Sequence, residues 1–193
     1  MKIIALAGGI GAGKSVVSHI LRIMGYDVYD TDSAARRIMD SSTEIKRFLR
    51  EKIAPDAVDG DGVINRAVVA AVVFADTERL ALLNAAVHSA VKADMRECAS
   101  ACGDVLFVET AIPVVSGIAD EADAVWEVTA PEDLRVARIC TRSSGMTAAQ
   151  ARARIAAQRA EHVGLAAYNP LILLNDGNAP LLPQVEAAIG LII

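Results

Sequence analysis

Short apolar segments alternate with longer segments of helical periodicity along the chain, and the apolar segments have the length of buried β-strands. Strands that alternate with helices are typical of an α/β fold, in which helices cover both faces of a mostly parallel sheet. We therefore predict a five-stranded parallel sheet flanked by helices. Its strands are expected at Lys2–Ala7, Asp27–Asp30, Asp104–Glu109, Ala124–Thr129 and Pro170–Asn175.

Several helices can be placed from their periodicity and their end signals. The first is expected from about Lys14 to Met24, because Gly25 suits the left-handed conformation in which many helices end. Helical spacing also covers Thr147–His162, and a closing helix is expected over Gln184–Ile192. These helices would connect the strands and cover the sheet.

A long, mostly helical segment separates the second and third predicted strands. Residues 33–102 span about seventy positions, far more than one crossover helix needs. A turn signal, Asp59-Gly60-Asp61-Gly62, interrupts this segment. We infer a helical insert that is large enough to hold a substrate.

The segment Gly8–Ser15 fits the phosphate-loop pattern G-x-x-x-x-G-K-[ST] without a gap, between the first strand and the first helix. Glycines let backbone N–H groups surround a phosphate, and the helix N-terminus adds partial positive charge. In such a loop Lys14 reaches the β- and γ-phosphates of ATP, and the Ser15 hydroxyl is a ligand for Mg²⁺. The fold class is therefore the P-loop NTPase fold, although the loop alone leaves kinases, GTPases and motor ATPases open. The residues predicted to bind the nucleotide are Gly9, Ile10, Gly11, Ala12, Gly13, Lys14, Ser15 and Val16.

Asp32 is a candidate general base. It follows the second predicted strand, and ligands of open α/β sheets bind outside the carboxyl ends of the strands. A carboxylate near the γ-phosphate can accept a proton from an attacking hydroxyl. The alternative is a helix N-cap, a role that Asp30 or Ser33 could fill equally well.

Composition narrows the classes of function further. Apolar residues make up 53% of the chain and aromatic residues 4%, so an aliphatic core is expected. The formal net charge of −5 argues against a nucleic-acid partner, because such domains usually carry a basic excess. No uncharged run reaches the roughly 20 apolar residues of a membrane-spanning helix, and the apolar N-terminus leads into the glycine loop instead of a signal-peptide cleavage site. We therefore expect a cytoplasmic protein without a membrane or nucleic-acid partner, and the oligomeric state stays open.

Two neighbouring motifs together resemble the dephospho-CoA kinase family. The phosphate loop is followed by Asp30-Thr31-Asp32-Ser33-Ala34-Ala35-Arg36, which is similar to the family pattern D-x-D-x-x-A-R. Further family motifs occur in the same order over nearly the full length. They are Asp61–Arg66, Val73-Phe74, Leu83–His88, Arg138 with Arg142, Ala157-Gln158 and Asn175–Gly177.

The resemblance implies that the γ-phosphate of ATP is transferred to the ribose 3′-hydroxyl of dephospho-CoA, which gives coenzyme A and ADP in the last step of CoA biosynthesis. In this reaction Asp32 would act as the general base, and Lys14 with Mg²⁺ would neutralise charge on the transferring group. Arg138 and Arg142 would stabilise the transition state from a lid. The substrate-binding residues would be Asp32, Arg36, Arg66 and His88.

The same resemblance implies a division of the chain into three parts. The nucleotide-binding core would consist of residues 1–32, 103–140 and 166–193. Residues 33–102 would form the insert that binds the CoA substrate, and residues 141–165 would form the lid.

Simpler explanations exist for several of these residues. His88 suits a packed, hydrogen-bonded side chain on an apolar helix, and Arg66 suits a surface ion pair. Arg138 and Arg142 share a helix face, but they lie in a region that is basic throughout.

Two other functions remain open at this point. A nucleoside or nucleotide kinase would share the core, and so would a regulatory protein that only binds nucleotide. The guanine-reading pattern N-K-x-D of GTPases is missing, and a strand that ends in Glu109 supports a motor-type ATPase only weakly. Departures from the family pattern leave the phosphate-binding motifs intact and bear on substrate preference. They are Ser89, Val114, Val115 and Pro170.

Overall fold

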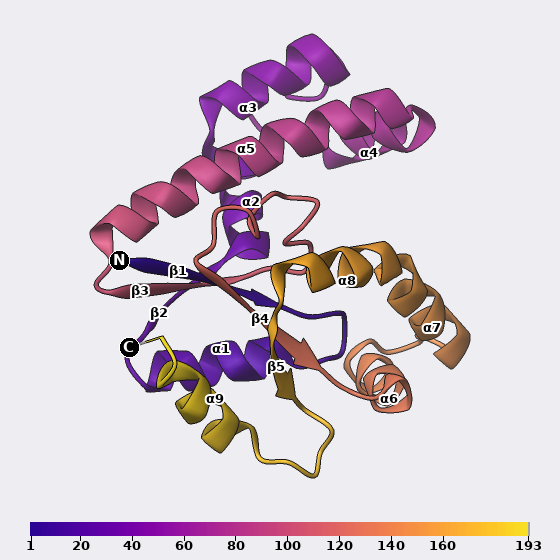
Figure 1. Cartoon of the computed structure of the whole chain (residues 1–193). Helices are drawn as coiled ribbons and strands as arrows, with labels where there is room; N and C mark the ends of the chain where they lie inside the picture. Colours follow the sequence, from indigo (N-terminus) through magenta and orange to yellow (C-terminus); the bar gives the residue numbers. More distant parts are fainter. Residues whose placement is uncertain (193) are drawn as a thin grey trace. The chain divides into compact units, whose positions relative to one another are not determined.

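A computed structural model describes residues 1–192 and contains one sheet of five parallel strands (Figure 1). The strands lie in the order β2-β3-β1-β4-β5, and every neighbouring pair is parallel. The predicted fold class is confirmed. The bounds are β1 Lys2–Ala7, β2 Asp27–Asp30, β3 Val105–Glu109, β4 Ala124–Thr129 and β5 Leu171–Leu174.

Contacts between residues divide the chain into two compact units. The first consists of Met1–Asp30 and Ala99–Ile193 and contains the whole sheet, and the second is Thr31–Cys98. The phosphate loop belongs to the first unit, whereas Asp32 belongs to the second.

One face of the sheet is covered by α1 (Lys14–Ile23) and α9 (Leu181–Ile189). Burying a large aliphatic side chain stabilises a fold by roughly 1.5–3 kcal/mol, so the side chains buried between these helices and the sheet are a main source of the first unit's stability. The buried side chains of the two helices and the strands form one cluster, which includes Ile4, Leu6, Val17, Leu21, Phe107, Trp126, Leu173 and Val185.

The strand β4 is buried on both faces of the sheet. Trp126 and Val128 belong to the cluster under α1 and α9, and successive side chains of a strand point to opposite faces. Glu127 therefore points to the other face, where α8 (Arg159–Leu165) lies. There the Nδ1 atom of His162 is 2.5 Å from Oε1 of Glu127.

The predicted helix over Thr147–His162 is divided into two helices, α7 (Ala148–Ala157) and α8. Thr147 and Gln150 form a capping box at the start of α7. The backbone of Gln158 leaves the helical conformation with φ −91° and ψ 3°, which ends α7. The helical spacing expected over Thr147–His162 is therefore observed, with Gln158 between the two helices.

The closing helix α9 begins at Leu181, three residues before the predicted start at Gln184. Pro183 lies in the first turn of this helix. The N–H groups of the first helical turn have no partner within the helix, so proline is tolerated there. The helix that follows β4 is α6 (Glu132–Arg142), and a short 3₁₀ turn, η2 (Ala166–Tyr168), lies between α8 and β5.

The second unit is helical. Its elements are α2 Thr31–Ser41, α3 Thr43–Phe48, the π-helical turn η1 Leu49–Ile53, α4 Arg66–Ala75 and most of α5, which spans Thr77–Ala101. Side chains cap three of these helices. Ser42 accepts a hydrogen bond from the first turn of α3, Asn65 from that of α4 and Asp76 from that of α5.

The predicted turn inside this unit is observed. Oδ1 of Asp59 accepts hydrogen bonds from the N–H groups of Asp61 and Val63 at 3.0 and 2.8 Å. Asp59 is thus an acceptor for two backbone donors that the turn would leave without a partner.

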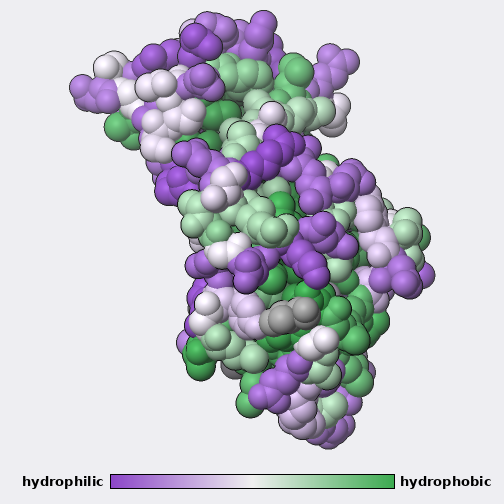
Figure 2. All heavy atoms as spheres, turned by 60° about the vertical axis from the view of Figure 1, so that its left-hand side comes forward, coloured by the Kyte–Doolittle hydropathy of each residue, from purple (hydrophilic) through white to green (hydrophobic). Residues whose placement is uncertain are grey.

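Within residues 1–192, no helix is long and apolar enough to cross a membrane. The face drawn in Figure 2 mixes hydrophilic and hydrophobic side chains. Single exposed apolar residues on such a surface are ordinary and need no special function.

Candidate active site

The phosphate loop joins β1 to α1 and has a backbone that requires glycine. Gly8, Gly11 and Gly13 have φ values of 144°, 78° and 106°, which residues with a Cβ rarely adopt. A Cβ at Gly8 would lie 2.5 Å from the carbonyl oxygen of Val128, and one at Gly13 would overlap Nδ2 of Asn175. The loop is therefore packed closely against β4 and the residue that follows β5.

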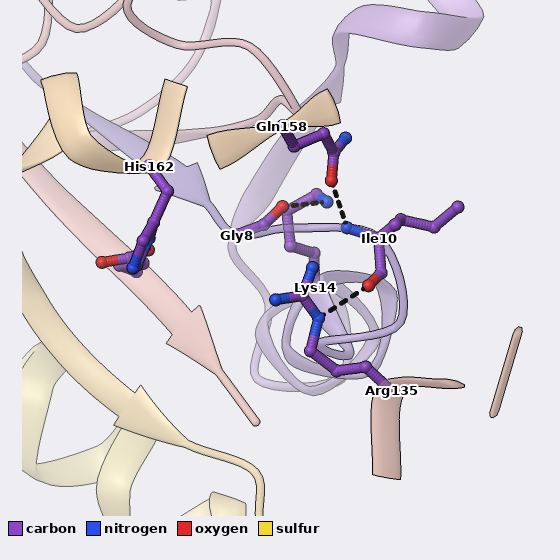
Figure 3. Close-up of polar contacts among 7 residues, drawn as sticks. Gly8, Ile10, Lys14, Arg135, Gln158 and His162 are labelled. Atoms are coloured by element: carbon purple, nitrogen blue, oxygen red, sulfur yellow. Dashed lines mark hydrogen bonds and ion pairs between the residues drawn. The ribbon is translucent and has the colours of Figure 1, made fainter. Parts of the chain in front are cut away.

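Three side chains make hydrogen bonds to the loop (Figure 3). The Ile10 N–H donates to Oε1 of Gln158 at 2.7 Å, and Nε of Arg135 donates to the Ile10 carbonyl at 2.9 Å. Nζ of Lys14 donates to the Gly8 carbonyl at 2.6 Å. The lysine and one backbone donor of the loop thus have protein partners, which a phosphate would have to replace.

Arg138 on α6 also contacts the loop. Its Nη1 atom lies 3.4 Å from the carbonyl oxygens of both Gly11 and Ala12, and its Nη2 donates to Oδ1 of Asn175 at 3.1 Å. Asn175 in turn donates from Nδ2 to the Ala12 carbonyl at 2.8 Å. Arg138 and Asn175 therefore hold the loop together, and Arg138 is brought to the predicted phosphate site.

The other two arginines of α6 differ in their surroundings. Arg135 is half-buried, and this burial lowers the pKa of its guanidinium, while the carboxylates of Glu132 and Glu127 oppose the shift. The guanidinium stays cationic at any ordinary pH. Arg142 is the last residue of the helix and is exposed, and no other group of residues 1–192 pairs with it. A catalytic role for Arg142 stays a prediction.

Oxygen donors are present where α1 begins and β3 ends. Ser15 lies exposed in the first turn of α1, which starts at Lys14 without a side-chain cap on Gly13. One turn later, the buried hydroxyl of Ser18 donates to Oε2 of Glu109 at 2.6 Å. The carboxylate at the end of β3 is thereby fixed.

A cavity of about 530 Å³ opens beside Gly8 and Gly9. Hydrogen bonds to Asp133 and Glu132 raise the pKa of Arg152 at its edge. Glu161 accepts hydrogen bonds from the backbone N–H groups of Val114 and Val115. Besides His162, the charged side chains around the cavity are Glu127, Glu132, Arg135, Arg152, Arg159 and Glu161.

The remaining predicted residues lie in the second unit. Asp32 is in the first turn of α2 and is exposed, as is Arg36 further along the same helix. Arg66 forms an ion pair with Asp40 at 2.6 Å, and both side chains are exposed. His88 is half-buried on α5. An exposed ion pair contributes little to stability, so Arg66 is not needed for the fold, and the substrate-binding roles stay predictions.

A comparison with known families identifies the family of kinases to which this phosphate loop belongs. The pattern of the family described as dephospho-CoA kinase matches residues 2–180. The chain belongs to the dephospho-CoA kinase family. A dephospho-CoA kinase of Bacteroides fragilis is 34% identical over 184 residues, which are 94% of this chain and 88% of that protein.

Solved structures share the fold of this chain. A protein from Thermus thermophilus has a TM-score of 0.76 at 33% identity, covering 99% of this chain and 95% of its own. A dephospho-CoA kinase from Campylobacter jejuni has a TM-score of 0.69 at 20% identity, over 98% and 96% of the two chains, which shows a shared fold.

The enzyme phosphorylates dephospho-CoA, which is the last step of coenzyme A biosynthesis, and ATP is the phosphate donor that a kinase of this family implies. The predicted family and activity are confirmed. The comparisons favour neither a nucleoside kinase nor a regulatory protein.

Sequence reasoning did not assign Arg135 or the pair Glu127–His162. Arg135 lies three residues before Arg138, and this spacing on one helix face was a usable signal. Glu127 interrupts an apolar strand with a charge, which was a second signal. Gln158 was noted only as part of a motif.

Proposed function

We propose that the phosphate loop binds ATP and that Asp32 activates the ribose 3′-hydroxyl of dephospho-CoA for attack on the γ-phosphate, which gives coenzyme A and ADP. The carboxylate of Asp32 takes the hydroxyl proton as the oxygen attacks phosphorus. Lys14 neutralises charge on the transferring phosphoryl group. The observation that carries the proposal is the glycine loop, which ends at the uncapped N-terminus of α1 with Lys14 as the first helical residue.

The sheet supports the choice of Asp32. In the parallel register Asp30 pairs with Glu109, and Glu109 pairs with Leu6, so the carboxyl ends of β2, β3 and β1 lie at one edge. The phosphate loop follows β1 at this edge. Asp32 is two residues beyond Asp30, and two residues of chain span at most about 7 Å.

The arginines of α6 are proposed to act on the phosphates. Arg138 contacts the loop, and Nε of Arg135 donates to the carbonyl of Ile10, which supports a role for both on a phosphate ligand. Arg142 is retained as a second stabilising group on a lid of residues 141–165. The dephospho-CoA would be held in the 33–102 insert by the exposed Arg36 and Arg66 and by His88.

Magnesium fits the donors at the start of α1. Mg²⁺ prefers oxygen ligands, and the exposed hydroxyl of Ser15 and the carboxylate of Glu109 are such groups. Ser15 would hold the ion, which when bound neutralises charge on the β- and γ-phosphates. A cytoplasmic location stays a prediction from the sequence.

A pair of substitutions tests the general base. Asp32→Asn keeps the shape of the side chain but removes the base, and a positioned base contributes ~10²–10⁴ in rate. We expect near-normal binding of ATP and dephospho-CoA, with a loss of at least ~100-fold in turnover. Calorimetric titrations and a steady-state assay of ADP formation measure the two quantities.

Asp30→Asn is the matched control, because Asp30 is the neighbouring carboxylate at the end of β2. Its effect on turnover should be much milder. Equal losses in the two variants would reject Asp32 as the base, while dephospho-CoA phosphorylation by the unmodified enzyme would still stand.

A further inference from the structure

Glu127 is a buried carboxylate in the wall of the cavity beside the phosphate loop. Its residue surface is 5% exposed, and it stands on β4 among apolar neighbours. A carboxylate at such a depth is costly unless hydrogen bonds satisfy it. A carboxylate at this position of the sheet is therefore a candidate for a function other than stability.

Only one oxygen of Glu127 has a protein partner. Oε1 lies 2.5 Å from Nδ1 of His162, and no group within residues 1–192 donates to Oε2. Fully buried polar atoms of these residues all have partners, so Oε2 must reach the cavity that Glu127 lines. The carboxylate therefore presents a fixed hydrogen-bond acceptor to whatever occupies the cavity.

His162 fixes the direction of this acceptor. It stands on α8 (Figure 3) and lines the cavity. Its side chain is 64% exposed. One oxygen is held by the ring, and a carboxylate accepts hydrogen bonds and donates none. The ligand group opposite it must be a donor.

The aliphatic part of the lining suits a flat apolar ring. Ala111, Pro113, Ile155, Ala156 and Leu165 contribute aliphatic walls. Polar backbone of the phosphate loop lies at the side of Gly8 and Gly9. The volume of about 530 Å³ falls in the range of small-molecule sites, which are mostly apolar with a few placed polar groups.

We propose that this cavity takes an adenine base and that Glu127, held by His162, accepts a hydrogen bond from its 6-amino group. Adenine has an apolar face and one exocyclic donor, which is the combination that the walls and the carboxylate require. A base with a 6-oxo group would instead set an acceptor against the carboxylate. Both substrates carry adenine, so the inference rests on the proposed binding of ATP and dephospho-CoA.

Substrate pairs that differ only in the base test this proposal. In one arm, dephospho-CoA is compared with its hypoxanthine analogue at fixed ATP; in the other, ATP is compared with ITP at fixed dephospho-CoA. A hydrogen bond to a charged group is lost with the 6-oxo base, so kcat/KM should fall by about 10- to 100-fold in one arm. The arm that shows the fall identifies the substrate whose base occupies the cavity.

Two glutamine variants test which carboxylate accepts the hydrogen bond from the 6-amino group of the base. The amide of Glu127→Gln can donate to a 6-oxo group, so the preference for adenine should shrink by at least about tenfold. Glu161→Gln is the control, because Glu161 lines the same cavity but its oxygens accept from backbone N–H groups at 2.5 and 3.3 Å. Glu161→Gln should keep the preference of the unmodified enzyme.

A second variant guards against misfolding of the first. His162→Asn frees the carboxylate without placing an amide at position 127 and should lower the adenine preference in the same arm. Equal use of both bases by the unmodified enzyme, or an unchanged preference in both variants, overturns the proposal. So does an effect of Glu127→Gln that disappears when the ribose 2′-hydroxyl is removed, since the carboxylate would then contact the sugar and not the base. All ratios are measured on active kinase, so these outcomes are distinct from a failure of the proposed mechanism.

Discussion

The side chain of Gln158 accepts a hydrogen bond from a backbone N–H of the phosphate loop, and removal of this side chain should strengthen ATP binding. Its Oε1 atom accepts the Ile10 N–H at 2.7 Å. In loops of this kind the backbone N–H groups bind phosphate oxygens. ATP therefore has to displace the amide oxygen of Gln158 before the Ile10 N–H can donate to a phosphate.

The expected gain follows from the strength of one hydrogen bond. A neutral hydrogen bond contributes a net ~0.5–1.5 kcal/mol, and 1.4 kcal/mol corresponds to a factor of ten in affinity. In Gln158→Ala, water replaces the amide oxygen and is displaced more easily. We expect the Kd for ATP to fall by about 2- to 10-fold.

Calorimetric titration with ATP measures this change, and a second substitution at the same position has the opposite sign. Gln158→Glu sets a charged acceptor against the Ile10 N–H, and such bonds are roughly twice as strong as neutral ones. The added negative charge also repels the phosphates, so this variant should bind ATP more weakly than the unmodified enzyme. If Gln158→Ala bound ATP no tighter, the amide would be no competitor of the phosphate and the reasoning would fail.

Two further predictions concern α6 and the turn after β5. Because Arg138 contacts the loop while Arg142 is exposed, Arg138→Ala should lower turnover at least ~10-fold more than Arg142→Ala in the steady-state assay; equal losses would show that both act from a lid. A hydrogen bond from the Ala179 N–H lowers the pKa of Asp176 below its ordinary 3.8, so its stabilisation is present above that value and is lost as the pH falls through the lowered pKa. Asp176→Asn should therefore lower Tm at pH 7 and change it less at pH 3, and a difference independent of pH would contradict the assignment.

The strands and the phosphate loop could be predicted because their signals are local. β1 reads as an apolar run that ends at a glycine pattern, and the helix after it has its own stop at Gly25. Gly25 has a φ of 90°, as the helix-end signal requires. Each of these features depends on neighbours within a few positions, which is the range over which hydrophobic period and turn chemistry act.

The contacts that shape the loop could not be predicted because they join distant parts of the chain. Gln158 lies 148 residues from Ile10, and Arg135 lies 125 residues from it. Nothing in the periodicity of α7 shows that the residue after its end contacts the loop. The charge of Glu127 was visible, but its partner on α8 depends on which face of β4 each helix covers.

These long-range contacts link the two proposed ligand positions of the first unit. Gln158 ends α7 and bonds the loop, while His162, four residues later on α8, holds the carboxylate in the adenine cavity. A phosphate that displaces Gln158 from Ile10 acts on the segment that carries His162. If a base in the cavity changes the affinity for phosphate at the loop by some factor, phosphate must change the affinity for the base by the same factor. If dephospho-CoA supplies the base in the cavity, ATP and dephospho-CoA binding should be coupled through residues 158–162, and Gln158→Ala, which removes the bond between this segment and the loop, should weaken that coupling.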